Sequence, residues 1–179
     1  MCPIKKRYFC LIIPVIIAIG MRIYYVNNDY EKMEICVYEE NEEFEHRGMN
    51  IRLSDARVIE YEEMESLYGD NKKIMDQYVE NKQMEGGQII AVNCHIENLT
   101  QSSYDELNVN IGYGTRGNGI ERLMTESVMP ELSETPGEYD ITLFFRVLEK
   151  WNDIGSDTVR ILFSRYPKQE YVKLRLRQG

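Results

Sequence analysis

Apolar and polar residues follow three different patterns along the chain. Residues 8–26 are almost continuously apolar, and their centre, Leu11–Ile19, carries no charge. Residues 61–85 place apolar side chains three or four positions apart, which is typical of helices. From residue 88 onward apolar and polar residues alternate, as they do in a strand with one buried face. The pattern therefore predicts an apolar helix followed by a β-rich domain that carries a helical insertion.

The first apolar stretch, residues 8–26, is long enough to cross a membrane. As a helix it would be about 28 Å long, close to the hydrocarbon thickness of a bilayer. A basic cluster, Lys5, Lys6 and Arg7, precedes it. The positive-inside rule then places residues 1–7 in the cytoplasm and everything after the helix outside. We therefore expect a single-pass signal-anchor in the cell membrane, with an extracellular C-terminal domain.

Two other interpretations of residues 8–26 remain open. The small residues around Ala18-Ile19-Gly20 have the spacing that a signal peptidase cleaves, so the segment could be a signal peptide that is removed. The second alternative is a buried core helix. A lipoprotein anchor is not expected, because no Leu-x-x-Cys motif precedes Cys2 or Cys10.

The rest of the chain divides into a spacer, residues 27–34, and one domain, residues 35–179, whose length suits a single hydrophobic core. Short strands separated by turn signals predict an all-β fold, an immunoglobulin-like antiparallel β-sandwich. The helical insertion at about 61–85 is expected to pack on an edge or end of a sheet. The expected strands are 34–38, 50–61 with a bulge near Ser54-Asp55, 88–99, 107–113, 141–147, 159–163 and 172–176.

Charge separates the two parts of the chain. The whole chain has a net charge of −9, and residues 1–26 hold four basic residues and no acidic one, which leaves −13 for the remainder. Such a charge makes nucleic acid and anionic headgroups unfavourable partners. Five glutamates between positions 39 and 45 lack the spacing of a calcium loop. We expect them to form a solvated connection.

Two cysteines, Cys36 and Cys94, fall in the part of the chain expected outside the cell, where a disulfide can persist. A bridge between them would stabilise the fold by about 4 kcal/mol on the chain-entropy estimate. Cys94 is also expected on the apolar face of its strand, where an unbridged cysteine packs well. Both possibilities remain open.

The glycines of Gly112-Tyr113-Gly114-Thr115-Arg116-Gly117 have the spacing of a dinucleotide-binding loop. Such a site also needs a parallel βαβ unit, whereas the flanking strands are expected to be antiparallel. We interpret the motif as a turn, with Asn118-Gly119 as its signal. The two histidines, His46 and His95, are expected at the surface, and they lack the spacing of zinc ligands. The sequence therefore nominates no catalytic, cofactor-binding or metal-binding residue.

A row of cations, Lys173, Arg175 and Arg177, is expected on the outward face of the last strand. Basic side chains on an edge strand block unwanted pairing with another sheet. We interpret the row in this way, with a docking stripe for a partner as the alternative. Trp151 is expected to fill the edge of the core after the strand 141–147.

Several short segments resemble a known group of proteins. They are Arg22–Asn27, Ile90–Asn98, Pro136-Gly137 leading into Ile141–Val147, and Ser164–Lys168. In these segments the chain is similar to uncharacterised, anchored exported proteins of Gram-positive bacteria with a telokin-like, immunoglobulin-like domain of unknown function. The resemblance implies a sandwich domain at the cell surface, and it implies neither an activity nor a functional residue.

Three classes of function fit these features. We expect first a non-enzymatic, membrane-tethered domain without a cofactor, which binds a surface protein or peptide. The second is an immunity or sequestration protein whose acidic surface captures cationic peptides. The third is a wall-active hydrolase, which would need a deep pocket with convergent polar groups.

Overall fold

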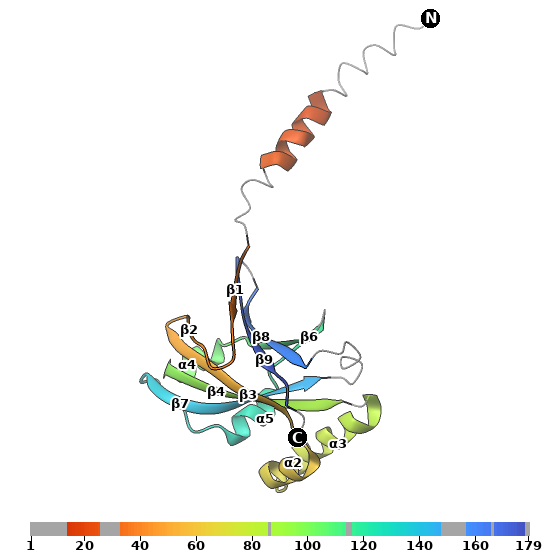
Figure 1. Ribbon diagram of the computed structural model, residues 1–179, viewed down its shortest axis with the longest axis vertical. Helices are drawn as coiled ribbons and strands as arrows, with labels where there is room; N and C mark the ends of the chain where they lie inside the picture. The colour runs from red at the N-terminus through yellow and green to blue at the C-terminus, as the bar shows by residue number, and fades with distance from the viewer. Residues whose placement is uncertain are drawn as a thin grey trace, which may run out of the picture. The chain divides into compact units, whose positions relative to one another are not determined.

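The computed structural model describes residues 14–25, 33–85, 87–113, 116–147, 157–165 and 167–177 (Figure 1). The chain divides into two compact units, and the boundary between them in the sequence falls between Glu34 and Ile35. In the first unit, residues 14–25 are helical and expose large apolar side chains such as Ile16. None of the described helices is both long and apolar enough to cross a bilayer. Residues 8–13 and residue 26 of the predicted span lie outside the described residues.

Two β-sheets form the second unit, in a sandwich-like arrangement. One sheet has five strands in the order β1-β9-β8-β5-β6, and the other has four in the order β2-β3-β4-β7. The strands are β1 (Glu34–Tyr38), β2 (Glu43–His46), β3 (Met49–Val58), β4 (Gln88–Leu99), β5 (Asn110–Tyr113), β6 (Arg116–Gly119), β7 (Gly137–Val147), β8 (Thr158–Ser164) and β9 (Lys168–Arg175). The helices are α2 (Tyr61–Tyr68), α3 (Lys72–Glu85), α4 (Gln101–Asp105) and α5 (Arg122–Val128).

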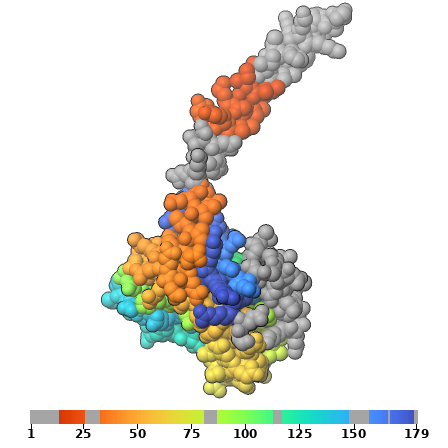
Figure 2. Space-filling view, viewed as in Figure 1, coloured from red at the N-terminus to blue at the C-terminus, as the bar shows by residue number. Residues whose placement is uncertain are grey.

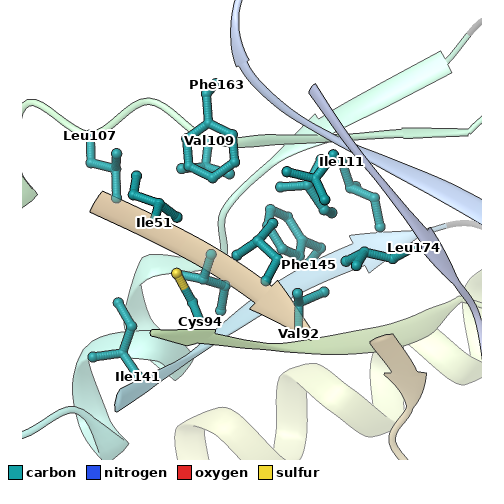
Figure 3. Close-up of a cluster of buried hydrophobic side chains, with 14 of the residues drawn as sticks. Ile51, Val92, Cys94, Leu107, Val109, Ile111, Ile141, Phe145, Phe163 and Leu174 are labelled. Carbon is teal, nitrogen blue, oxygen red and sulfur yellow. The ribbon is translucent and has the colours of Figure 1, made fainter. Parts of the chain in front are cut away.

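The core lies between the two sheets, because each alternating strand turns its apolar residues to the same side. Figure 3 shows Ile111, Phe163 and Leu174 of the five-stranded sheet with Ile51, Val92, Cys94 and Phe145 of the four-stranded sheet, all of them buried. The longest pairing joins β4 to β7, from Gln88 opposite Val147 to Leu99 opposite Gly137. The predicted two-sheet sandwich is confirmed at this level.

The first β-hairpin departs from the prediction in one respect. β3 is bulged as predicted, since its register with β4 shifts between Ser54 and Arg57. The acidic run, however, is more than a solvated connection, because its second half forms β2. Alternation along β2 buries Phe44 and His46 while Glu43 and Glu45 stay exposed. The high glutamate content hid this two-residue period.

The helical insertion forms where the period predicted it, as α2 and α3. Asn71 caps α3, since its Oδ1 accepts a hydrogen bond from the N–H of Ile74 at 3.4 Å. The helices pack on a face of the four-stranded sheet, against residues at the start of β4 and near the end of β7. With α5 they form a second core whose buried sheet residues are Ile89, Ala91 and Phe144.

The position of β9 overturns another expectation. β9 lies between β1 and β8, so it is an interior strand of its sheet. Figure 2 shows the residues of β1, in orange, directly beside those of β9, in blue. The cations of β9 therefore do not protect a sheet edge, and the edge-blocking interpretation is wrong.

Candidate functional site

A buried pair of hydrogen-bonded side chains joins the two sheets at one end of the sandwich. His46 comes from β2 and Glu170 from β9, and their side chains are 6% and 8% exposed. The His46 Nδ1 atom lies 2.8 Å from Glu170 Oε2. Phe163 packs against the imidazole, with 5.5 Å between the ring centroids. His46, expected at the surface, is thus a core residue, because β2 turns it inward.

Two further groups hold the Glu170 carboxylate. Lys168 Nζ lies 2.7 Å from Oε1, and the Ser164 hydroxyl donates to Oε2 at 3.4 Å and to the Lys168 carbonyl. Burial by itself raises the pKa of Glu170, but the hydrogen bonds and charges of Lys168 and His46 bring that pKa below its usual 4.5. Glu170 is therefore a carboxylate at neutral pH. Neither of these two contacts of Ser164 is to an imidazole, the partner that activates a serine nucleophile.

A hollow of about 500 Å³ opens beside this pair. We call it the arginine hollow; its lining residues are Arg47, Asn108, Asn110, Leu162, Phe163, Ser164 and Arg165. Leu162 and Phe163 give it apolar lining, and the other residues offer guanidinium, amide and hydroxyl groups. The residues that line it include no carboxylate. Such a set of donors suits an anionic or acceptor-rich group.

Arg47 reaches the hollow from a strained backbone position. Arg47 and Gly48 form the two-residue turn between β2 and β3, with φ angles of 53° and 80°. A turn with two positive φ angles favours Asn or Asp before Gly, because an ordinary side chain costs roughly 1 kcal/mol there. Strain of this kind gathers at functional sites. The described contact of the guanidinium is with the Glu106 carbonyl, at 3.3 Å.

The outward face of the five-stranded sheet continues from the hollow as rows of residues. One row reads Gly117, Gly112, Arg160 and Lys173 across β6, β5, β8 and β9. The next reads Gly119, Asn110, Leu162 and Tyr171, and it shares Asn110 and Leu162 with the hollow. Arg175 lies opposite Thr158, two residues from the pair of Arg160 and Lys173 and on the side away from the hollow. None of these ten positions is acidic.

The predicted docking stripe is partly rearranged. Lys173 and Arg175 lie on the outward face of β9, as alternation requires. Arg177 instead pairs with Asp55 at 3.0 Å and with Glu40 at 3.4 Å. Sequence reasoning missed Arg160, which lies opposite Lys173. The alternation of Val159, Ile161 and Phe163 already marked it as outward, but nothing in the sequence pairs β8 with β9.

The cysteine pair is not bridged, since neither Cys36 nor Cys94 is in a disulfide. Cys94 is buried among the core side chains, which matches the alternative of a packed thiol (Figure 3). Cys36 lies on β1 and is only half-buried. Burial raises the pKa of the Cys94 thiol far above its usual value.

His95 lies on the polar face of β4, as expected. Its Nδ1 is 2.8 Å from Asp140 and its Nε2 is 3.5 Å from Glu138. A second hollow of about 430 Å³ covers this face, between β3, β4 and β7. Both carboxylates are largely exposed, at 90% for Asp140 and 70% for Glu138. The arrangement is a solvated cross-strand pair.

The glycine motif lies in an antiparallel hairpin. Gly112 pairs with Gly117 and Tyr113 with Arg116, so β5 and β6 lack the helix that a dinucleotide site requires. The connection falls between Tyr113 and Arg116, not at Asn118-Gly119. Across the described residues, no group of three or more His, Cys, Asp or Glu could hold a metal ion. Trp151 lies outside the described residues.

No protein-family model matches the chain, and no curated protein matches it significantly. Among solved structures, it is similar to an uncharacterised β-sandwich protein from Clostridium difficile 630. The two share 12% identity at a TM-score of 0.41, over 79% of this chain and 97% of the other. At that level the likeness transfers no site residue and no activity.

Proposed function

We propose that the chain is a membrane-tethered, extracellular domain of immunoglobulin-like topology that binds a protein or peptide and catalyses no reaction. The arginine hollow is the observation that carries the proposal. It gathers hydrogen-bond donors beside the apolar Leu162 and Phe163, and the described residues that line it include neither a carboxylate nor a histidine. A hydrolase of the glycosidase type needs two carboxylates around its substrate.

The order of the strands supports an immunoglobulin-like topology. Such domains place strands A, B and E in one sheet and G, F, C and C′ in the other. Taken in chain order from β3, the sheets β3-β4-β7 and β9-β8-β5-β6 reproduce that division. The end of β3 also runs parallel to the end of the chain, through the bridge from Arg57 to Arg177. β1 and β2 are additions at the sheet edges.

The proposed membrane tether is supported by the residues of the first unit. Residues 8–26 carry only one charged residue, Arg22, and the preceding residues are basic. The described helix over residues 14–25 exposes Ile16 and Ile23 by 62% and 57%, and it exposes Tyr24 by 65%. Large apolar side chains around a whole helix are stable in lipid and unfavourable in water.

The tether is tested by labelling. Ser102 is exposed at the start of α4, and Ser102→Cys places a thiol there. Because the free Cys36 is only half-buried, both chains carry Cys36→Ser. A membrane-impermeant maleimide added to intact cells should then label the Ser102→Cys variant and leave the Cys36→Ser chain unlabelled. Labelling that requires lysis of the cells contradicts an extracellular domain.

Binding at the hollow is tested by photo-crosslinking in those cells. A photoreactive phenylalanine analogue at Asn108, on the rim of the hollow, should give a discrete adduct. The same analogue at Lys73, exposed on α3, is the matched control and should not give that adduct. The double variant Arg47→Glu, Arg165→Glu should abolish the adduct. An adduct that is equal from both positions, or is insensitive to the arginines, refutes the hollow as the binding site.

A further inference from the structure

The outward face of β8 and β9 carries like charges that no carboxylate of the described residues compensates. Arg160 and Lys173 are directly opposite in the antiparallel register, and Arg175 follows two residues later on the same face. Like charges at opposite positions of a sheet destabilise it. Among the described residues, no carboxylate lies within ion-pair distance of these three cations. The three cations therefore favour the binding of an anionic group that belongs to another molecule.

Two apolar side chains separate this basic group from the arginine hollow. Leu162 and Tyr171 are opposite each other in the next row, and Arg160 lies over the Tyr171 ring at 5.8 Å from its centroid. Leu162 also lines the hollow, whose arginines form a second basic group. Along β8 the surface therefore reads basic, apolar, basic. A regular strand would advance about 13 Å from Arg160 to Ser164, and the register with β9 shifts once in this stretch, between Leu162 and Ser164.

An extended peptide has the same repeat as the strand beneath it. Residues i, i+2 and i+4 of such a peptide point to one side, and i to i+4 spans about 13 Å. Carboxylates at i and i+4 would then meet the two basic groups, and an apolar residue at i+2 would meet Leu162. Across the row, Gly112 and Gly117 carry no side chain, and Leu162 Cδ1 lies over Gly112, only 2.8 Å from where a Cβ would be.

We propose that the outward face of β8 and β9, together with the arginine hollow, docks an extended acidic peptide segment in which two carboxylates, four residues apart, flank an apolar side chain. This inference rests on the proposed binding function and names its ligand. The cationic face is a local exception in a domain whose net charge is strongly negative, so its complement is an acidic chain. The attraction is electrostatic and weakens with added salt.

Fluorescence anisotropy tests the proposal with the full chain in a nonionic detergent. The probe is a labelled peptide, Glu-Ser-Leu-Ser-Glu, and the comparison is the scrambled peptide Glu-Glu-Ser-Ser-Leu of equal charge. We expect the first to bind at least fivefold more tightly than the second. Equal binding of the two peptides would mean that charge alone attracts them, and it would overturn the proposed spacing.

Two charge-matched variants locate the site. Arg160→Glu, Lys173→Glu should weaken binding more than tenfold; because it keeps a like-charged pair in the same register, it leaves the fold equally stable. Lys72→Glu, Lys73→Glu changes the net charge identically on α3, whose lysines are exposed, and should alter binding less than twofold. Equal losses in both variants, or no loss in the first, overturn the proposal.

The remaining outcomes separate this inference from the proposed function. Vesicles of phosphatidylglycerol and phosphatidylcholine in equal parts should not displace the peptide; displacement would assign the face to a membrane surface. If the crosslinked adduct from Asn108 forms in cells while neither peptide binds, the ligand class is wrong and the binding function stands. If the adduct is also missing, both fail.

Discussion

The buried pair of His46 and Glu170 should be the most pH-sensitive stabilising contact in the domain. Glu170→Gln keeps the shape of the side chain and removes its charge. A buried hydrogen bond to a charged group contributes about 1.5–3 kcal/mol, and a neutral one about 0.5–1.5 kcal/mol. The variant should therefore lose about 1–2 kcal/mol at pH 7 through its contact with His46. The contact with Lys168 adds little, because that lysine is 44% exposed.

The pH dependence has a definite sign. The folded protein holds the pKa of Glu170 below 4.5, so the carboxylate stabilises the fold above that pH. The stabilisation is lost as the pH falls through the lowered pKa, since the proton then binds more readily to the unfolded chain. The difference between the parent chain and Glu170→Gln should be full at neutral pH and should shrink below about pH 4.

Urea unfolding, followed by tyrosine fluorescence and circular dichroism in a nonionic detergent, measures the effect. With a slope near 2 kcal/mol per molar urea, the midpoint should fall by about 0.5–1 M. Glu138→Gln is the matched control, because Glu138 also faces a histidine but is 70% exposed. The control should leave the midpoint unchanged. A Glu170→Gln variant as stable as the parent chain at pH 7, or equally weakened at pH 3, would refute the reasoning.

Three further predictions concern single side chains. Arg47→Asn should raise stability by about 1 kcal/mol in the same urea assay, because Asn tolerates the positive φ angle, while it weakens the adduct at the hollow; a less stable variant contradicts the strain. Thr100→Ala should cost about 1 kcal/mol, since Thr100 caps α4 by accepting from the Ser103 N–H; no change in the urea midpoint contradicts the cap. The Cys94 thiol should resist iodoacetamide until the domain unfolds, because it is buried and its pKa is raised; mass spectrometry of the native chain that finds Cys94 alkylated contradicts its burial.

Much of the fold follows from periodicity. The strand over residues 88–99 and the two helices of the insertion were predicted because their apolar residues repeat at a single period. The packing of these helices on a face of the sheet was not predicted. Only two residues of β4, Ile89 and Ala91, make its second face apolar, and they give a weak signal. β2 was missed because Phe44 is its only large apolar residue, and a strand of four residues gives a weak alternation signal.

The candidate site depended on contacts that no local pattern contains. Lys173 and Arg175 could be placed on one face by alternation, but their neighbour Arg160 is known only from the register of β8 with β9. The pairing of His46 with Glu170 joins residues 124 positions apart. Arg47 lies in the turn after β2, and because that strand was not predicted, no local pattern marked the turn.

Nuclear magnetic resonance mapping on the labelled protein tests whether an acidic peptide docks on the outward face of β8 and β9. The full chain, labelled with ¹⁵N in nonionic detergent micelles, is titrated with the peptide Glu-Ser-Leu-Ser-Glu. We expect the backbone amide signals of Gly112, Arg160, Leu162 and Lys173 to change in chemical shift, and those of α2 and α3 to stay unchanged. Shifts confined to the His95 face, or spread evenly over the domain, would contradict it.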